Sequence, residues 1–202
     1  MIKVIIFDNN GVLTSCDDDT TIPRLAKYFN VDTEYLRPIF HEVVRPADLG
    51  EITTDEFLSR LMSALGKSRP ISEIHKIILD SYQPKPEMQK LLGDLREQHR
   101  FALLTNFIDV FDVLNETSWH YERFFRPENI FVSSKLHLAK PDKAFYRFVL
   151  DKLGCKPDEA VFIDDREPNI TSARIIGLKT ILFRSPAQCR NGLELLLEKE
   201  NV

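Results

Sequence analysis

Polar and charged residues that could take part in catalysis follow several short apolar segments of the chain. The four groups are Asp8–Thr14, Thr105 with Asn106, Lys140–Asp142, and Asp164 with Asp165 and Asn169. A single Asp or Asn after a strand usually serves the turn itself. Four such groups indicate a shared site, because the carboxyl ends of parallel strands lie along one edge of a sheet.

The chemistry that these residue types suggest is phosphoryl transfer. Asp8, Asp164 and Asp165, if they converge, would repel one another and would need a cation between them. Oxygen-only ligands favour Mg²⁺, which commonly bridges to a phosphate oxygen. Lys140 adds a fixed positive charge, and Thr105 adds a hydroxyl donor for an anionic group. Such a set suits in-line displacement at phosphorus, and a carboxylate can itself be the attacking group.

Five short apolar runs are predicted to be the buried parallel strands that position these residues. They are Ile2–Phe7, Phe101–Leu104, Ile130–Val132, Val161–Ile163 and Thr180–Phe183. Amphipathic patterns typical of helices separate the later runs. The alternation of strands and helices predicts an α/β fold with a parallel sheet.

The pattern changes between residues 17 and 85, where four helical patterns occur near 20–30, 33–44, 54–65 and 71–81. A helical insertion directly after the first strand lies at the carboxyl edge of the sheet, where ligands bind in open α/β folds. We therefore predict a helical cap domain over residues 17–85 and an α/β core domain formed by residues 1–16 and 86–202.

The side chains of the predicted cap give little further guidance. His41 and Arg45 lie on its second helical pattern, where they could face the substrate, but we expect them on a solvated helix face.

Composition limits the classes of partner. The formal net charge of −4 over 202 residues argues against a large basic surface for nucleic acid or an anionic membrane. Three scattered cysteines without a CxxC pair argue against a disulfide framework and favour a reducing compartment. The amino-terminal apolar run is too short for a signal peptide. These features predict a cytoplasmic protein without nucleic-acid or membrane partners, and they leave open whether it is a monomer or a homodimer.

The order of the four motifs distinguishes two families that share such a residue set. In response-regulator receivers the acid pair comes first, whereas here the candidate nucleophile comes first and the acid pair last. This order, with a helical insertion after the first strand, resembles the haloacid dehalogenase-like hydrolase superfamily over essentially the whole chain. The matching segments are Phe7–Leu13, Leu104–Asn106, Lys140–Asp142 and Phe162–Asn169. The second and fourth segments look most like the branch that contains the phosphatase domain of soluble epoxide hydrolases.

The resemblance implies a Rossmannoid three-layer core, with a parallel sheet of strand order 5-4-1-2-3 and a C1-type helical cap. It implies Mg²⁺ ligation by Asp8, the backbone carbonyl of Asn10 and Asp165, with Asp164 acting through a water. Asp8 would also be the nucleophile. Gly11 would let the chain turn sharply out of the first strand.

The resemblance also implies which residues surround the phosphate. Thr105 and the backbone amide of Asn106 would hold the phosphoryl group, and Lys140 would screen the charge between that group and Asp8. Asn169 would orient the acid pair. The expected activity is hydrolysis of a small phosphorylated metabolite, a phosphate monoester, through an aspartyl-phosphate with Mg²⁺.

Asn10 departs from the family pattern, which has an aspartate at this position to protonate the leaving oxygen and later to activate water. An amide cannot exchange that proton, and general acid–base assistance contributes about 10²–10⁴ in rate. Three explanations remain open. The chain is an engineered Asp-to-Asn variant of a phosphatase, a natural enzyme with weakened turnover, or a phospho-ligand-binding protein that has lost catalysis.

A 2-haloacid dehalogenase is a further alternative, because that branch of the superfamily also lacks an aspartate at the position of Asn10. Those enzymes need no metal, and their fourth motif has no acid pair of this type. The adjacent Asp164 and Asp165 therefore argue against dehalogenation.

Overall fold

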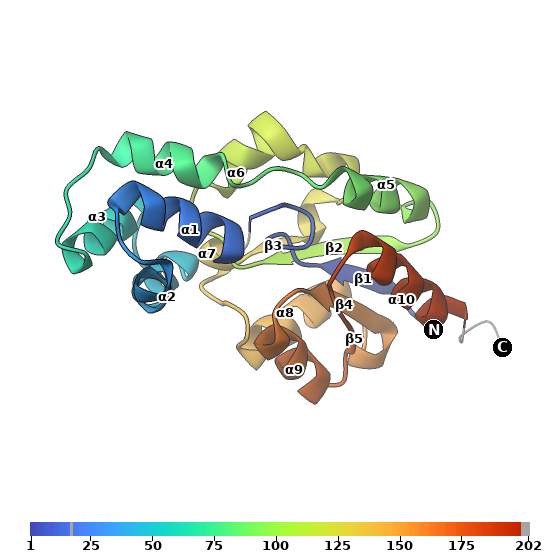
Figure 1. The fold of residues 1–202 in the computed structure, drawn as a ribbon. Coiled ribbons are helices and arrows are strands. Elements are labelled where there is room, and N and C mark those ends of the chain that lie inside the picture. The colour runs from blue at the N-terminus through green and yellow to red at the C-terminus, as the bar shows by residue number, and fades with distance from the viewer. Residues whose placement is uncertain (17, 199–202) are drawn as a thin grey trace.

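The computed structural model describes residues 1–16 and 18–198 and is built around a five-stranded parallel sheet (Figure 1). The strand order is β3-β2-β1-β4-β5, which confirms the predicted α/β fold and the predicted order. The strands are β1 (Val4–Phe7), β2 (Arg100–Thr105), β3 (Ile130–Val132), β4 (Ala160–Asp164) and β5 (Lys179–Leu182).

The central strand β1 is apolar on both faces because both faces are covered. Ile5 pairs with Phe101 of β2 on one side and with Val161 of β4 on the other. Since side chains alternate along a strand, Ile5 and its neighbours contribute to two separate cores, one on each face of the sheet. The polar residues therefore begin only where the strand leaves this double cover, at Asp8.

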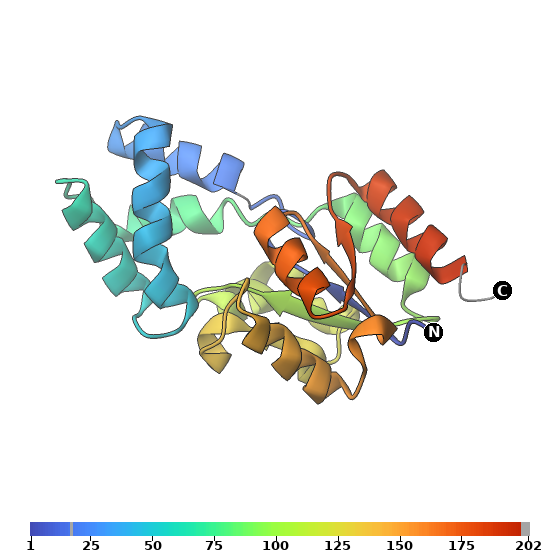
Figure 2. The same ribbon diagram turned by 90° about the horizontal axis from the view of Figure 1, so that it is seen from below.

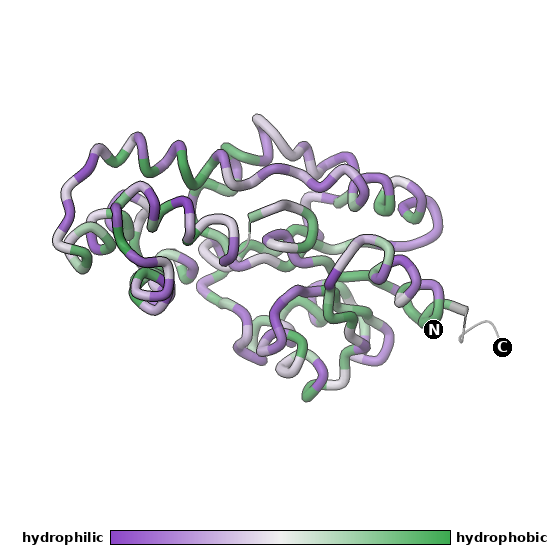
Figure 3. Tube along the Cα trace, viewed as in Figure 1, coloured by the Kyte–Doolittle hydropathy of each residue, from purple (hydrophilic) through white to green (hydrophobic). Residues whose placement is uncertain are grey.

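Helices form the outer two layers of the core. One face carries α5 (Pro86–Leu95) and α10 (Pro186–Glu198), and the other carries α8 (Lys143–Leu153) and α9 (Glu167–Ile175) (Figure 2). Apolar residues concentrate along the strands between these layers, and polar residues lie along the outer helices (Figure 3). The shorter elements are α6 (Phe111–Leu114), a π-helical turn (Asn115–Trp119), α7 (Ser133–Leu136) and 3₁₀ turns at Tyr121–Arg123, Pro127–Asn129 and Pro157–Glu159.

Four helices lie between β1 and α5, as the sequence pattern predicts. They are α1 (Asp18–Phe29), α2 (Thr33–Asp48), α3 (Thr54–Ala64) and α4 (Ile71–Leu79). Figures 1 and 2 both show this helical group beyond the carboxyl ends of the strands. Its position supports the prediction of a cap over residues 17–85, but the division into domains stays a prediction.

Helix α2 continues to Asp48, four residues beyond the predicted end at residue 44. Pro46 lies in its last turn, where the sequence pattern favours a break. The helix continues because Ala47 is fully buried among the helices, so packing outweighs the local penalty. This extension is what carries Asp48 to the edge of the sheet.

Two adjacent segments connect the helical group to the core. Thr14 and Pro84 form an antiparallel bridge, and the amide of Ser15 donates to the carbonyl of Gln83 at 2.8 Å. The amide of Lys85 donates to the carbonyl of Leu13 at 2.8 Å. The helical group is thus attached through a short paired ribbon. Across the described part of the chain, none of the helices combines the length and apolar character that a membrane span requires.

Candidate active site

Three carboxylates meet at the carboxyl edge of the sheet. Asp8 follows β1, Asp164 ends β4 and Asp165 follows it, and each offers an oxygen within 4.8 Å of the others. Asp8 and Asp164 are buried, at 4% and 0% exposure. The convergence that the motif spacing predicts is therefore present.

Lys140 lies between two of these carboxylates. Its Nζ is 2.7 Å from Oδ1 of Asp8 and 2.7 Å from Oδ2 of Asp164, and its side chain is 1% exposed. Burial alone would lower the pKa of Lys140, but the attraction of Asp164 and Asp8 raises it above its ordinary value. The ammonium group therefore stays charged and compensates part of the buried negative charge.

One ammonium does not compensate three carboxylates. Burial, together with the charges of Asp164 and Asp165, raises the pKa of Asp8 well above its usual range, against the opposing effect of Lys140. Burial and Asp164 raise the pKa of Asp165 to about 6. Three oxygen donors with uncompensated charge at this spacing fit a hard divalent cation such as Mg²⁺.

Asn169 and Gly11 support the acid pair from two sides. Nδ2 of Asn169 lies 3.0 Å from both carboxylate oxygens of Asp164. Gly11 has a φ of +75°, and a Cβ there would lie 2.0 Å from Oδ2 of Asp165. Only glycine lets the loop after β1 approach Asp165 this closely.

Asn10 lines the same cavity, and its amide is engaged with the next loop. Nδ2 of Asn10 donates to the carbonyl of Asn106 at 3.3 Å, and its Oδ1 accepts from Nδ2 of Asn9 at 3.2 Å. The side-chain nitrogen thus donates one hydrogen bond and the side-chain oxygen accepts another. The side chain at this position contributes hydrogen bonds and no titratable proton.

Thr105 ends β2 and Asn106 follows it, and Asn106 links the end of that strand to the loop that carries Lys140. Nδ2 of Asn106 donates to the carbonyl of Lys140 at 2.9 Å, while the amide of Lys140 donates to Oδ1 of Asn106 at 2.8 Å. The hydroxyl of Thr105 is buried and donates to the carbonyl of Asn106 at 3.3 Å. The two loops are therefore fixed relative to each other and to Asp8.

Further contacts hold the loop that follows β1, and the sequence pattern did not predict them. The amide of Asn9 donates to Oδ1 of Asp8 at 2.6 Å, and the hydroxyl of Tyr121 donates to Oδ1 of Asn9. Tyr121 is buried in an aromatic cluster with Trp119 and Phe125. Only the fold brings this tyrosine to the loop, so no local pattern could have indicated it.

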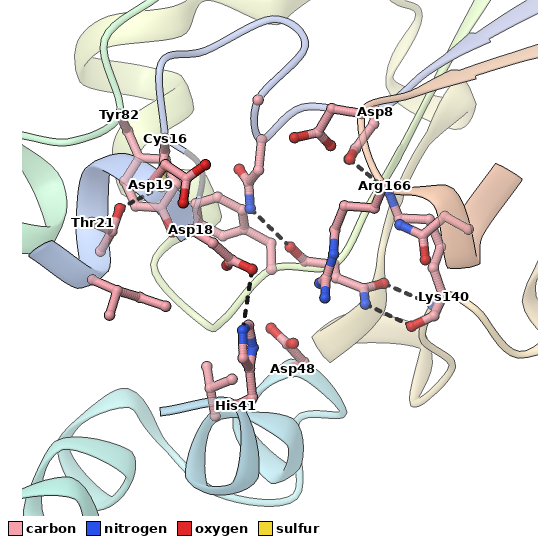
Figure 4. Close-up of a pocket in the computed structure, with 18 of the residues that line it drawn as sticks. Asp8, Cys16, Asp18, Asp19, Thr21, His41, Asp48, Tyr82, Lys140 and Arg166 are labelled. Carbon is pink, nitrogen blue, oxygen red and sulfur yellow. Dashed lines mark hydrogen bonds and ion pairs between the residues drawn. The ribbon is translucent and has the colours of Figure 1, made fainter. Parts of the chain in front are cut away.

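Asp8, Asp165 and Lys140 line a cavity of about 530 Å³ whose opposite wall comes from α1 and α2 (Figure 4), while Asp164 lies buried behind Lys140. His41 belongs to that wall, and its Nε2 lies 3.1 Å from Oδ2 of Asp18. Of the two positions considered for His41, the structure favours the one facing the cavity, although its side chain is still 34% exposed. Arg45 is exposed as expected, yet its Nη1 donates to the carbonyl of Lys140 at 3.1 Å.

Comparisons with known proteins agree with this arrangement. Residues 2–177 match the model of the haloacid dehalogenase-like hydrolase family. The chain is 25% identical to a D-ribitol-5-phosphate phosphatase from Bacteroides thetaiotaomicron, over 98% of this chain and 99% of that one. A HAD family enzyme of the same organism, crystallised with magnesium and inorganic phosphate, superposes with a TM-score of 0.76 at 25% identity, over 91% of this chain and 95% of that one.

The branch suggested by the motifs also has a counterpart among the relatives. The bifunctional epoxide hydrolase 2 of Rattus norvegicus is 30% identical over 149 residues, which are 69% of this chain. The chain spans 26% of that protein, and 36% of a drimenol cyclase from Aspergillus calidoustus that it matches at 24% identity. With a family match over most of its length and the expected strand order, the chain belongs to the haloacid dehalogenase-like hydrolases.

Proposed function

We propose that the protein hydrolyses small phosphate monoesters with Asp8 as the nucleophile and that Asn10 weakens its turnover. The observation that carries this proposal is the buried contact of Lys140 with both Asp8 and Asp164 at the floor of the cavity. A carboxylate held beside a fixed cation, at the floor of a cavity large enough for a metabolite, suits attack on phosphorus. The phosphatase named among the relatives supports the same reaction type.

Mg²⁺ is the proposed cofactor. Asp8, the backbone carbonyl of Asn10 and Asp165 would hold it, with Asp164 near by, and it would neutralise negative charge on the phosphoryl group. The spacing of the three carboxylates supports this assignment, and so does the magnesium and phosphate bound by the related HAD enzyme.

The proposed reaction has two displacements. A carboxylate oxygen of Asp8 forms a bond to phosphorus while the bond to the leaving-group oxygen breaks, and that oxygen departs with the bonding electrons. The departed oxygen takes a proton from solvent. Water then adds to phosphorus and gives up a proton to solvent, the bond to Asp8 breaks, and phosphate is released with the carboxylate restored. Lys140 keeps positive charge beside Asp8 in both steps, Thr105 and the amide of Asn106 hold the phosphoryl group, and Asn169 fixes Asp164.

Asn10 leaves the departing oxygen without a protein acid. An aryl phosphate departs as a stable phenolate and needs little protonation, whereas an alkyl or sugar phosphate departs as a basic alkoxide. Turnover should therefore be weak on alkyl esters and less impaired on aryl esters. The amide's bond to the carbonyl of Asn106 supports a role in shaping the loop in place of proton transfer.

A panel of alkyl and nitrophenyl phosphates with Mg²⁺, run on the wild type and on Asn10→Asp, tests the proposal. We expect Asn10→Asp to raise alkyl phosphate turnover by about 10²–10⁴ and nitrophenyl phosphate turnover by less. A slow second displacement would limit both ester types equally, and a pre-steady-state burst on the aryl ester would identify that case. Equal rates for both forms on every ester, without a burst, would contradict the role of this position.

The second candidate is a phospho-ligand-binding protein, and Asn10 is the observation that favours it. Such a protein would bind phosphate esters with Mg²⁺ and stay inert in both forms of the panel. An enzyme limited by its missing acid would gain turnover in Asn10→Asp. The same panel thus separates the two functions.

The helices α1–α4 are proposed to act as the cap domain, over residues 17–85, and to enclose the leaving group. Their contribution of His41, Asp18 and Asp48 to the cavity supports this. We also propose a cytoplasmic location. Within the described residues, Cys16, Cys155 and Cys189 form no disulfide, which is consistent with a reducing compartment.

A further inference from the structure

Asp48, the last residue of α2, places a carboxylate in the cavity with no partner (Figure 4). Its side chain makes no hydrogen bond or ion pair with any residue of 1–16 or 18–198. The residue is partly buried, and the loss of solvent raises its pKa to about 7 despite the nearby charges of Arg45 and Arg166. Keeping a partly buried, unpaired carboxylate charged is unfavourable, and a polar ligand in the cavity would relieve that cost.

Arg166 presents the opposite charge from the core side of the cavity. It follows Asp165, and its backbone amide donates to Oδ1 of Asp164 at 2.8 Å. Its guanidinium makes no hydrogen bond or ion pair within the described residues, and Figure 4 shows it extending toward the side from which Asp48 comes. Its charge lowers the pKa of both Asp48 and Asp18, so it acts across the cavity.

The neighbouring polar groups of the same wall are already satisfied. Asp18 pairs with His41 at 3.1 Å, and Arg37 pairs with Asp19 at 3.1 Å. Asp48 and Arg166 therefore differ from the groups around them. They face each other across the cavity from the helical group and from the sheet edge, and the described residues show no ion pair between them (Figure 4).

We propose that Asp48 and Arg166 together bind a hydroxyl group of the substrate's leaving group, which makes polyol or sugar phosphates the preferred substrates. This inference rests on the proposed phosphatase function. A hydroxyl donates to the carboxylate and accepts from the guanidinium, so one uncharged group satisfies both. An ammonium would be repelled by Arg166 and a carboxylate by Asp48, whereas an apolar leaving group would leave both charges unpaired.

The test compares glycerol 1-phosphate with n-propyl phosphate, which has the same carbon chain without the hydroxyls. Both are assayed with Mg²⁺ on the wild type, Asp48→Ala, Asp48→Asn, Arg166→Gln and the control Glu42→Gln. Glu42 lies on α2, is exposed and does not line the cavity. The wild type should favour glycerol 1-phosphate in kcat/KM by about 10-fold or more, because a site built for a hydroxyl rejects an analogue that lacks it.

In Asp48→Ala and Arg166→Gln, kcat/KM for glycerol 1-phosphate should fall by about 10-fold or more, mainly through KM, with less than about a 3-fold change for n-propyl phosphate. Asp48→Asn should recover part of the loss, because its amide oxygen still accepts from a hydroxyl. Glu42→Gln should keep the wild-type preference. Inhibition by inorganic phosphate should be unchanged in Asp48→Ala, which shows that the phosphate site is intact.

Equal losses on both esters in Asp48→Ala would overturn the inference, because Asp48 would then act through the fold. Preference for 2-aminoethyl phosphate over glycerol 1-phosphate would overturn it too, in favour of an ammonium ligand. Calorimetry of both esters with Mg²⁺ separates this inference from the proposed function. Tighter binding of glycerol 1-phosphate without any turnover would support the hydroxyl site and contradict hydrolysis. Turnover of both esters without a preference for glycerol 1-phosphate would support hydrolysis and contradict the hydroxyl site.

Discussion

The two walls of the cavity differ in how their polar groups are used. On the sheet side, Lys140 pairs with both Asp8 and Asp164. Asn169 donates to Asp164, and Asn106 donates to the carbonyl of Lys140. On the helical side, Asp18 pairs with His41, but Asp48 has no hydrogen bond or ion pair among the described residues. The guanidinium of Arg166, at the border of the sheet side, is likewise unpaired within the described residues. Under the proposed function, the residues that act on every substrate are held in position by strands buried on both faces. Asp48, which would bind the leaving group, is left unpaired for that contact.

The largest expected effect follows from removal of the proposed nucleophile, Asp8. Asp8→Asn should lower turnover of every phosphate ester by about 10³-fold or more, because the attacking oxygen is lost while the rest of the sheet-side wall remains. Steady-state assays on an aryl ester measure this. Turnover within about 10-fold of the wild type would show that another group attacks phosphorus.

Removing the buried cation tests how strongly the sheet-side wall depends on its internal pairing. Lys140→Met should lower the free energy of unfolding by about 3–5 kcal/mol, because the carboxylates of Asp8 and Asp164 would lose their buried partner. Urea denaturation without added metal gives the value. The control is Lys135→Met. The ion pair of Lys135 with Asp112 is exposed, so its loss should lower the free energy of unfolding by less than about 1 kcal/mol.

The affinity for Mg²⁺ tests the role of Asp165, which lies on the sheet side of the cavity. Asp165→Ala should weaken Mg²⁺ binding by about 10–100-fold or more, since even indirect supports of a metal commonly contribute that much. Isothermal titration calorimetry measures the affinity, with the exposed Asp158→Ala as the control. An unchanged affinity in Asp165→Ala would contradict the assignment of this ligand.

The smallest expected effect concerns the unpaired carboxylate of the helical wall. The pKa of Asp48 is raised by burial to about 7, so the folded state holds a proton that the unfolded state releases. Asp48 therefore lowers stability progressively as pH rises from about 4 to 7, and the penalty persists above that window. Asp48→Asn should be more stable than the wild type by about 1–2 kcal/mol at pH 8 and should match it near pH 4.

Thermal and urea unfolding at several pH values provide the check for Asp48, with Glu42→Gln as the exposed control on the same helix. A difference that does not change with pH would mean that Asp48 is not the titrating group. If Lys140→Met and Asp48→Asn moved stability in the same direction at pH 8, the contrast between the two walls would fail.

The sequence determined most of the sheet and of the sheet-side wall. Apolar runs followed by acidic or polar residues locate the strand ends, and parallel strands must bring those ends to one edge. Asp8, Lys140, Asp164 and Asp165 are therefore readable from local pattern and motif order, and the structure brings all four together. The amide at Asn10 is likewise a matter of sequence alone, whatever its consequence for turnover.

The tertiary structure alone decided the helical wall. Helix α2 extends to Asp48 only because Ala47 is buried by packing, and that packing turns His41 into the cavity. Arg166 and Asp48 come together from segments far apart in the chain. A helix pattern gives the face that packs but not the partner it packs against, because the apolar contacts that orient one helix on another are non-directional and depend on the whole fold.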